Sequence, residues 1–318
     1  MTRTAPALDL PDLRGRRALV TGGSDGIGRR IATRLAAAGA EVLLPVRSAG
    51  KGAAARDGIL TEHPGAQVDL SSLDLASLAS VRALTARLLE DGQGIDLLVL
   101  NAGVMTPPER RTTADGFELQ LGTNHLGHVA LVAGLLPLLR EHRARVVTQV
   151  SVAARSGSVH WEDLQSARSY DAGRAYASSK IALGLFATKL QRRSDDAGWG
   201  LTSVLSHPGV AATNLLAAHP EYGRGETSLS RRLIGALSSR GILLGTAESA
   251  ALPALLAAMD PSPVEGMMYG PGGLGHLGGA PTRHALYRPL RSTADASRVW
   301  DLSLELTDAP LAWAHGHR

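Results

Sequence analysis

The strongest constraint on the fold is a regular alternation of short apolar segments and helical patterns along this 318-residue chain. Apolar, β-prone segments predict strands at 17–21, 41–46, 66–70, 95–101, 145–151 and 200–206, with an edge strand at 266–269. Helices are predicted at 27–38, 51–63, 76–91, 116–141, 173–196, 246–259 and 294–306. Strands that alternate with helices of this length pair in parallel through right-handed crossovers. The pattern therefore predicts an α/β fold, a doubly wound parallel sheet with helices on both faces.

A glycine-rich turn, Thr21-Gly-Gly-Ser-Asp-Gly-Ile-Gly28, lies between the first predicted strand and the first predicted helix. Glycines let the backbone turn tightly and approach a pyrophosphate, and the following helix offers unpaired N–H groups and the positive end of its dipole. This placement predicts a Rossmann-type dinucleotide site. The residues expected to hold the cofactor here are Gly22, Ser24, Asp25, Gly26, Ile27 and Gly28.

The end of the second predicted strand bears on the choice between NAD(H) and NADP(H). Dinucleotide folds place an acidic residue there, which accepts hydrogen bonds from the adenosine ribose. This chain has Val46 followed by Arg47, and a guanidinium attracts the 2′-phosphate that a carboxylate would repel. Asp25 in the glycine-rich turn argues the other way. The sequence favours NADP(H) over NAD(H) and leaves both open.

Tyr176 and Lys180 lie four residues apart within a predicted helix, so both side chains share one helix face. A tyrosine has a pKa of roughly 10, and it needs a neighbouring cation that favours the phenolate to transfer a proton near neutral pH. Lysine is scarce in this chain, with only Lys51, Lys180 and Lys189. We therefore expect Lys180 to lower the pKa of Tyr176.

Ser151 ends the predicted strand at 145–151, at the carboxyl edge of the sheet where ligands of doubly wound folds bind. A serine at the end of a strand is usually only a turn residue. The presence of Tyr176 and Lys180 in the same sequence favours a different interpretation, in which Ser151 holds a substrate oxygen.

The alternation of predicted strands and helices stops between residues 211 and 245, where Gly and Ser flank a short amphipathic stretch at 229–237. An insertion at the carboxyl edge of a strand often covers a site. We expect a single dinucleotide-binding and catalytic domain over 1–318, with a small substrate lid at about 211–245 and a C-terminal extension at about 271–318.

These motifs follow the order found in the short-chain dehydrogenase/reductase family, which the chain resembles over about residues 14–260. The matching positions are Thr21-Gly-x-x-x-Gly-Ile-Gly28, Asp74-Leu75, Asn101-Ala-Gly103, Asn124, Ser151, Tyr176-x-x-x-Lys180 and Pro208-Gly209. Asn124-His-Leu-Gly-His128, the long gap before Tyr176 and His207-Pro-Gly209 resemble the retinol dehydrogenase and protochlorophyllide reductase branch. That branch mostly uses NADP(H) and acts on bulky apolar carbonyls or alcohols. The chain departs from the family pattern at Ser24-Asp25 and Thr148-Gln-Val150.

The resemblance implies roles for further residues. Asn124 would hold a water that relays protons to Lys180, which completes a catalytic set with Ser151 and Tyr176. Lys180 would also bond the nicotinamide ribose, so that Tyr176 and Lys180 contact the cofactor as well. The other cofactor contacts implied are Asp74 and Leu75 near the adenine, Asn101, Ala102 and Gly103 along the adenosine side, Thr123, and Pro208, Gly209, Val210 and Thr213 beside the nicotinamide carboxamide.

Composition excludes several other chemistries. Without cysteine there is no disulfide or thiolate nucleophile, and we expect a cytoplasmic protein. Residues 1–17 lack the apolar core of a secretory signal, and the longest apolar run, 129–139, is too short to span a bilayer. A net charge of +4, spread along the chain, does not predict nucleic-acid binding, and no His-Glu-x-x-His pattern predicts a metal. The excess of arginine over lysine is typical of a high-GC, bacterial coding sequence.

The sequence thus predicts an oxidoreductase that transfers a hydride between NADP(H) and a hydrophobic ketone, aldehyde or secondary alcohol. Apolar residues of the lid, together with Trp161, indicate the hydrophobic substrate; the lid residues are Leu215, Leu216, Leu233, Ile234 and Leu237. Two alternatives stay open: an epimerisation or dehydration without net redox change, and a non-enzymatic module that senses NADP(H). A homodimer or homotetramer is also open, because relatives often pair through the helices equivalent to 116–141 and 173–196.

Overall fold

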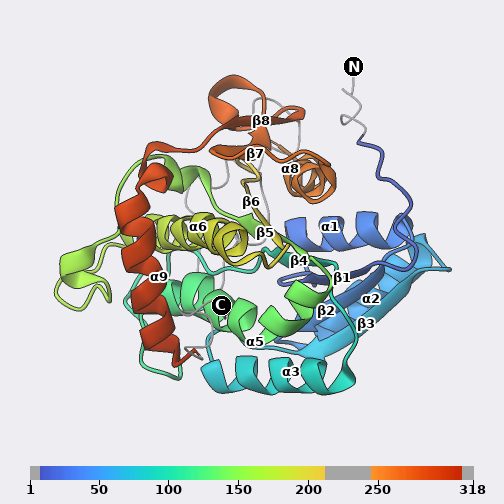
Figure 1. The fold of residues 1–318 in the computed structure, drawn as a ribbon, viewed down its shortest axis with the longest axis horizontal. Coiled ribbons are helices and arrows are strands. Elements are labelled where there is room, and N and C mark those ends of the chain that lie inside the picture. Colours follow the sequence, from blue (N-terminus) through green and yellow to red (C-terminus); the bar gives the residue numbers. More distant parts are fainter. Residues whose placement is uncertain (1–7, 212–244, 310–318) are drawn as a thin grey trace.

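An eight-stranded sheet forms the centre of the protein, with the strand order β3-β2-β1-β4-β5-β6-β7-β8 (Figure 1). The computed structural model describes residues 8–211 and 245–309. The strands are β1 Arg17–Val20, β2 Glu41–Val46, β3 Gln67–Ser72, β4 Leu97–Leu100, β5 Arg145–Gln149, β6 Thr202–Ser206, β7 Met267–Pro271 and β8 Pro281–Ala285. All neighbouring strands pair in parallel except β7 and β8. The predicted doubly wound α/β fold is confirmed.

Helices cover both faces of the sheet, as Figure 1 shows. They are α1 Gly26–Ala37, α2 Ala49–Glu62, α3 Leu78–Asp91, α4 Leu119–Leu121, α5 Gly127–Glu141, α6 Ala172–Ala197, α8 Ala247–Met259 and α9 Thr293–Thr307. Successive strand residues point to opposite faces, so Leu19 joins the core beneath α3, α5 and α6, whereas Val20 joins the core beneath α1 and α8. The chain leaves β1 toward β2 on one side and returns to β4 on the other. Ligands of doubly wound sheets bind at this reversal.

The predicted helix at 116–141 is wrong at its beginning. Gly116 has a φ of +84°, outside the helical region, and the helix starts only at α4, where the Glu118 side chain accepts hydrogen bonds from the Gln120 and Leu121 amides at 3.0 and 2.7 Å. A π-helical turn, Gly122–Leu126, then separates α4 from α5. Such turns commonly lie at functional sites, and this one carries Asn124.

The edge of the sheet also differs from the prediction. The strand expected at the edge, seen as β7, is interior because β8 pairs with it in antiparallel fashion. The glycine-rich segment after β7 turns the chain back: the Gly272 amide donates to the Ala280 carbonyl at 2.8 Å, and the Gly273 amide to the Gly278 carbonyl at 2.9 Å.

The C-terminal helix α9 packs across α6 and α5. The rings of Phe186 and Trp300 stack with centroids 5.0 Å apart, and His125 Nε2 lies 2.6 Å from Ser303 Oγ. This part of the α5–α6 surface, which the sequence offered as a subunit contact, is therefore covered from within the chain. Within the described residues, no helix combines the length and apolar character needed to cross a membrane.

The predicted lid at about 211–245 lies outside the described residues, except for its two ends. Ala211 and Gly245 form an isolated parallel bridge, and the Gly245 amide donates to the Val210 carbonyl at 2.9 Å. The insertion thus leaves and re-enters the fold at one point, beside the end of β6. Thr213 and the five apolar lid residues lie outside the described part of the chain.

Candidate active site

A cavity of about 450 Å³ opens at the carboxyl ends of β1, β2, β4 and β5, within the size range of ligand sites. Most of the predicted site residues line it: Gly22, Ser24, Asp25, Gly26, Ile27, Gly28, Arg47, Asp74, Leu75, Asn101, Ala102, Gly103, Thr123, Tyr176, Lys180 and Pro208. Asn124, Ser151, Gly209 and Val210 do not line it. We call this space the main cavity.

The glycine-rich turn brings the N-terminus of α1 against the main cavity. Asp25 caps the helix by accepting a hydrogen bond from the Gly26 amide at 2.7 Å. A Cβ atom on Gly28 would lie 2.2 Å from the Gly22 carbonyl oxygen and 2.4 Å from Asn101 Nδ2. No larger side chain fits there without a shift of the backbone, so glycine at this position lets the turn and the end of β4 meet.

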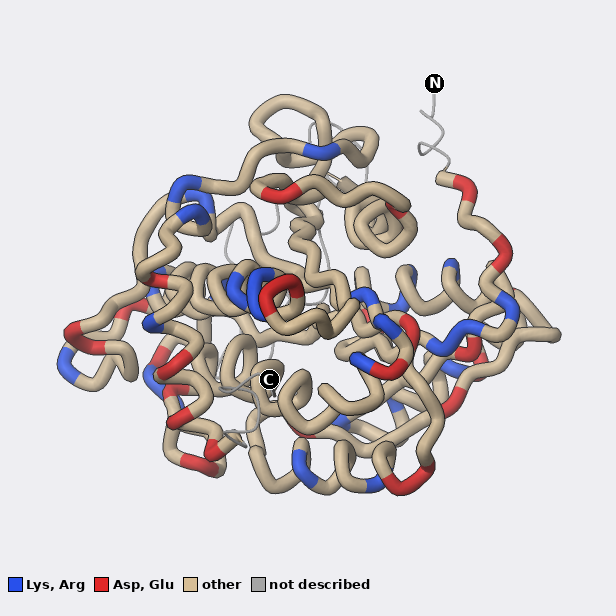
Figure 2. The backbone as a smooth tube through the Cα atoms, viewed as in Figure 1, with Lys and Arg blue, Asp and Glu red and all other residues tan. Residues whose placement is uncertain are grey.

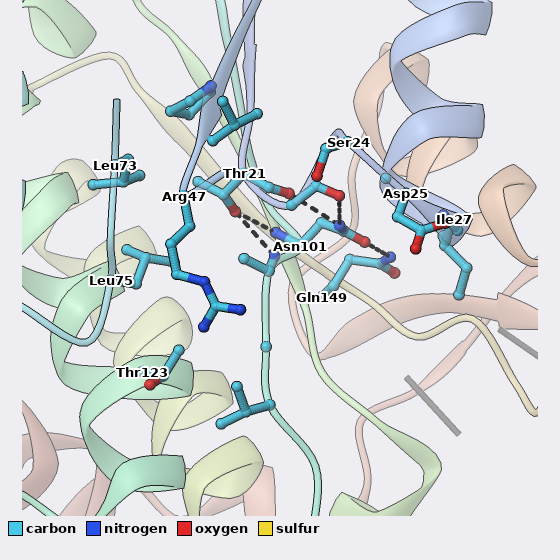
Figure 3. Close-up of a pocket in the computed structure, with 18 of the residues that line it drawn as sticks. Thr21, Ser24, Asp25, Ile27, Arg47, Leu73, Leu75, Asn101, Thr123 and Gln149 are labelled. Carbon is cyan, nitrogen blue, oxygen red and sulfur yellow. Dashed lines mark hydrogen bonds between the residues drawn. The ribbon is translucent and has the colours of Figure 1, made fainter. Parts of the chain in front are cut away.

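A hydrogen-bond network joins the ends of four strands at the cavity floor. Thr21 Oγ1 accepts from the Asn101 and Ala102 amides at 2.9 and 3.0 Å, and Asn101 Nδ2 donates to the Thr21 carbonyl at 2.9 Å. Gln149 Nε2 donates to Asn101 Oδ1 at 3.0 Å (Figure 3), and Ser206 Oγ donates to Gln149 Oε1 at 3.0 Å. The sequence marked Gln149 only as a departure from the family pattern, and its structural role was not predicted.

Arg47 follows β2 and reaches across the main cavity. Figure 3 shows its side chain directed toward Thr123 and Leu75 and away from Asp25. Lys51, in the first turn of α2, lines the same end of the cavity. Two cationic side chains therefore gather where the sequence placed the adenosine end of a cofactor.

Ser151 lies beside Tyr176, close enough for its hydroxyl to favour the phenolate of Tyr176. Ser151 follows β5 and caps the 3-10 turn Val152–Arg155, where its Oγ accepts from the Ala153 amide at 3.2 Å. Tyr176 comes from the first turns of α6 and is buried. The residues that the sequence assigned to substrate binding and proton transfer are thus in contact.

Lys180 lies one turn further along α6, with its Nζ donating to the Gln149 carbonyl at 3.1 Å. Burial lowers its pKa from 10.5 to about 8. The net shift of the Tyr176 pKa is upward, opposite to the expected direction, and a lowering of this pKa by Lys180 itself stays a prediction. Burial, which penalises the phenolate, raises the pKa of Tyr176, and the Ser151 hydroxyl opposes this rise only in part.

Asn124 is buried in the π-helical turn, and its side chain is fully engaged. Its Oδ1 accepts from the Val104 amide at 2.7 Å, while its Nδ2 donates to the Val104 carbonyl and to Ser179 Oγ, each at 3.0 Å. These bonds fix the loop after β4 to α6. A Cβ on Gly103 would lie 3.5 Å from Lys180 Nζ and 3.0 Å from Asn124 Oδ1, so little space separates these groups. The relay water implied by the resemblance stays a prediction.

His128 links Asn124 to the glycine-rich turn, a role that the sequence did not predict. Its Nδ1 lies 2.9 Å from the Asn124 carbonyl oxygen, which can only accept, so Nδ1 carries the proton. Its Nε2 is then an acceptor, 3.1 Å from Thr21 Oγ1. Burial, with a smaller contribution from Lys180, lowers the His128 pKa to about 3 and keeps the ring neutral. Its spacing four residues after Asn124 was the one sequence signal available.

Three residues predicted to contact the cofactor or the substrate point elsewhere. The Val210 amide donates to the Leu277 carbonyl at 2.8 Å, and Gly209, with a φ of +72°, packs against the same carbonyl, so both face the C-terminal extension. Trp161, expected beside the substrate, does not line the main cavity. Its Nε1 donates to Asp295 at 3.2 Å, and the Arg298 guanidinium lies 4.1 Å from its ring centre, so it anchors α9.

Comparison with known proteins gives consistent matches. A family model described as short chain dehydrogenase matches residues 16–222. Human retinol dehydrogenase 13 is 40% identical over 63% of this chain and 60% of its own length. Mouse polyprenol dehydrogenase is 43% identical over 65% and 63%, and mouse retinol dehydrogenase 11 is 35% identical over 95% and 89%. For the first two relatives, the match spans less than two thirds of their length.

Solved structures show the same architecture. An uncharacterised protein of Mycobacterium paratuberculosis superimposes with a TM-score of 0.74 and 34% identity, covering 95% of this chain and 96% of that one. A complex of Pseudomonas aeruginosa RhlG with NADP gives a TM-score of 0.59 and 26% identity, covering 80% and 93%.

Proposed function

The chain belongs to the short-chain dehydrogenase family of NAD(P)-dependent oxidoreductases, in its retinol dehydrogenase-like branch, and on this premise we propose its reaction. It transfers a hydride between NADP(H) and a hydrophobic ketone, aldehyde or secondary alcohol. The observation that supports this most is the contact of Ser151 with Tyr176 beside the buried Lys180, at the wall of a cavity large enough for a ligand.

The main cavity fits a dinucleotide. The amides at the start of α1 and the glycine-rich turn suit a pyrophosphate, and the turn is closed so tightly that only glycine fits at position 28. Arg47 and Lys51 suit the 2′-phosphate of NADP(H), because a guanidinium and an ammonium attract a phosphate, although the carboxylates of Asp25 and Asp74 also line the main cavity. The similar NADP-bound enzyme adds support for this choice over NAD(H). When bound, the nicotinamide supplies or accepts the hydride.

The protein's own groups handle the substrate oxygen and its proton. Because its pKa is raised, Tyr176 holds its proton at neutral pH and can donate it to a carbonyl oxygen in the reductive direction. The Ser151 hydroxyl supplies a second donor at the same oxygen. Lys180 uses one N–H for the Gln149 carbonyl and has two left for the ribose hydroxyls, and below a pH of about 8 it adds a positive charge near the developing phenolate.

A hydrophobic substrate is supported by two observations. The relatives are named for retinol and polyprenol, both alcohols with long apolar chains. Val104, Met105 and Val150 add apolar surface to the main cavity near Tyr176 and Lys180. We therefore propose an alcohol or carbonyl on a long or polycyclic hydrocarbon framework.

The test is Tyr176→Phe in the full-length protein, assayed by NADPH oxidation at the nicotinamide absorbance band with a panel of hydrophobic aldehydes and ketones. Loss of the proton donor should lower turnover by roughly 10²–10⁴-fold, with cofactor affinity nearly unchanged. Tyr170→Phe is the matched control, because Tyr170 bonds the Pro107 carbonyl and does not line the main cavity. Wild-type turnover in Tyr176→Phe would refute the proposal.

A further inference from the structure

A second cavity, of about 340 Å³, shares no lining residue with the main cavity. It lies between the 3-10 turn that follows Ser151 and the chain that leads from β8 to α9. We call it the basic pocket, and its lining residues are Arg155, His276, His284, Ala285, Leu286, Tyr287, Arg288 and Arg291. In Figure 2, blue segments gather where the chain passes from β8 to α9.

Within the described part of the chain, the positive charge of the basic pocket has no acidic partner in its lining. Arg155, Arg288 and Arg291 line it together with two histidines, and its lining contains no carboxylate. Among the residues that the structure describes, none of these three arginines forms an ion pair, whereas Arg283 on the adjoining strand pairs with Asp260 at 3.4 Å. Like charges that converge on a hollow without a counter-charge create a potential that attracts anions.

Backbone contacts position two of the guanidinium groups. Arg291 donates through Nε to the Leu286 carbonyl at 2.7 Å, and Arg155 donates through Nη1 to the Gly275 carbonyl at 3.4 Å. A guanidinium carries five N–H donors in one plane, so each of these groups keeps donors for a ligand. Planar pairs of N–H donors match the oxygens of a carboxylate or a phosphate.

The imidazoles form an ordered wall of the basic pocket. The rings of His276 and His284 stack with centroids 4.3 Å apart. His276 Nδ1 lies 3.0 Å from the Pro271 carbonyl oxygen, so Nδ1 carries the proton and Nε2 is the ring atom left for a ligand.

The basic pocket is coupled to the turn beside the main cavity. The Gly209 amide donates to His207 Nδ1 at 3.2 Å, so the proton of this ring sits on Nε2, which lies 2.9 Å from His284 Nε2. Tyr287 Oη also lies 3.0 Å from His207 Nε2. One imidazole therefore separates the basic pocket from Pro208, which lines the main cavity.

We propose that the basic pocket binds an oxyanion, a carboxylate or a phosphate, either as a charged end of the substrate or as a separate small anion. The site uses the three guanidinium groups as donors and the stacked imidazoles of His276 and His284 as one wall. This inference goes beyond hydride transfer and does not depend on it, because binding at the pocket is measured without turnover.

The experiment titrates inorganic phosphate into the NADP-saturated full-length protein at constant ionic strength, with NMR detection of the His276 and His284 imidazole signals. The wild-type protein should show a saturable shift of both signals. Arg288→Gln/Arg291→Gln should bind phosphate at least about tenfold more weakly, because two charge-assisted contacts are lost. Arg82→Gln, an exposed change on α3, should bind like the wild type. Circular dichroism and thermal melting check that each variant is folded. Arg155→Gln tests whether the opposite wall of the basic pocket contributes to phosphate binding.

Shifts that do not saturate, or that are equal in wild type and Arg288→Gln/Arg291→Gln, would overturn the proposal. A second measurement separates the two sources of the anion. If the substrate supplies it, straight-chain aldehydes with a terminal carboxylate should have a lower KM than uncharged ones, and the double variant should lose this preference. If phosphate binds and no such preference exists, the occupant is a separate anion.

Discussion

Replacing Lys180 by methionine should raise the stability of the protein at neutral pH while removing its activity. Lys180 is fully buried, and burial lowers its pKa from 10.5 to about 8. A drop of this size corresponds to about 3 kcal/mol, since one pH unit is worth ~1.4 kcal/mol. This is the free energy that burial of the charge costs at pH 7, and methionine, of similar length, removes it.

The pH dependence isolates this cost. Below pH 8 the lysine is charged in both the folded and the unfolded chain, and the full cost is present. Between pH 8 and 10.5 the unfolded chain retains a proton that the folded chain has released, so wild-type stability rises with pH in this window. The advantage of Lys180→Met should therefore shrink by about 2 kcal/mol between pH 7 and 9.5. Lys180→Met also loses the hydrogen bond from Nζ to the Gln149 carbonyl. This loss offsets part of the stability gain at every pH, because a neutral amine donates the bond as well as an ammonium does.

Urea unfolding of both proteins at a series of pH values measures this difference, and NADPH oxidation measures activity. Turnover should fall by at least about 10²-fold in Lys180→Met, as for other losses in proton-transfer machinery. Lys189→Met, on the same helix but outside the main cavity, should keep its activity. A stability difference that stays constant from pH 7 to 9.5 would show that Lys180 carries no buried charge, and the reasoning would fail.

Three further changes test other parts of the site. Arg47→Gln should weaken NADP(H) binding by about tenfold or more in a fluorescence titration, through loss of a charge-assisted bond, and leave NAD(H) binding unchanged; equal effects on both cofactors would contradict the assigned contact. Gly28→Ala should weaken binding of either cofactor and lower the melting temperature, because its Cβ would lie 2.2 Å from the Gly22 carbonyl oxygen, whereas Gly50→Ala, with nothing within 4 Å, should do neither. His128→Ala should cost about 2–5 kcal/mol in urea unfolding, since it removes two buried hydrogen bonds, to the Asn124 carbonyl and to Thr21 Oγ1, and leaves a cavity; a change below about 1 kcal/mol would argue against this link.

The sequence predicted the parts of the fold that local pattern controls. Strand and helix positions, the parallel sheet and the pairing of Tyr176 with Lys180 follow from periodicity and spacing. The first part of the helix predicted at 116–141 could not be excluded in this way, because a glycine at position 116 is compatible with a helix until its positive φ is known. Likewise β8 carries no strong β pattern and exists because the glycine-rich turn folds it onto β7.

The site was predicted where a motif carries the chemistry and missed where tertiary packing does. Gln149 and His128 act mainly through partners on other elements, and only the spacing of His128 from Asn124 gave a sequence signal for either role. The pKa of Tyr176 was assigned in the wrong direction because burial outweighs every other influence on its phenol, and burial is a property of the fold. Trp161 is of a residue type that often contacts apolar substrates, yet its side chain bonds to α9, which lies more than 130 residues away along the chain.

The central claim, direct hydride transfer, is tested most directly by isotope tracing. The protein would be supplied with NADPH deuterated at either face of nicotinamide carbon 4, together with a hydrophobic aldehyde that it consumes, and the alcohol product analysed by mass spectrometry. The account predicts that one of the two labelled cofactors delivers one deuterium to the carbinol carbon for each NADPH oxidised. A product that carries no deuterium from either cofactor, or that forms without loss of NADPH, would contradict it.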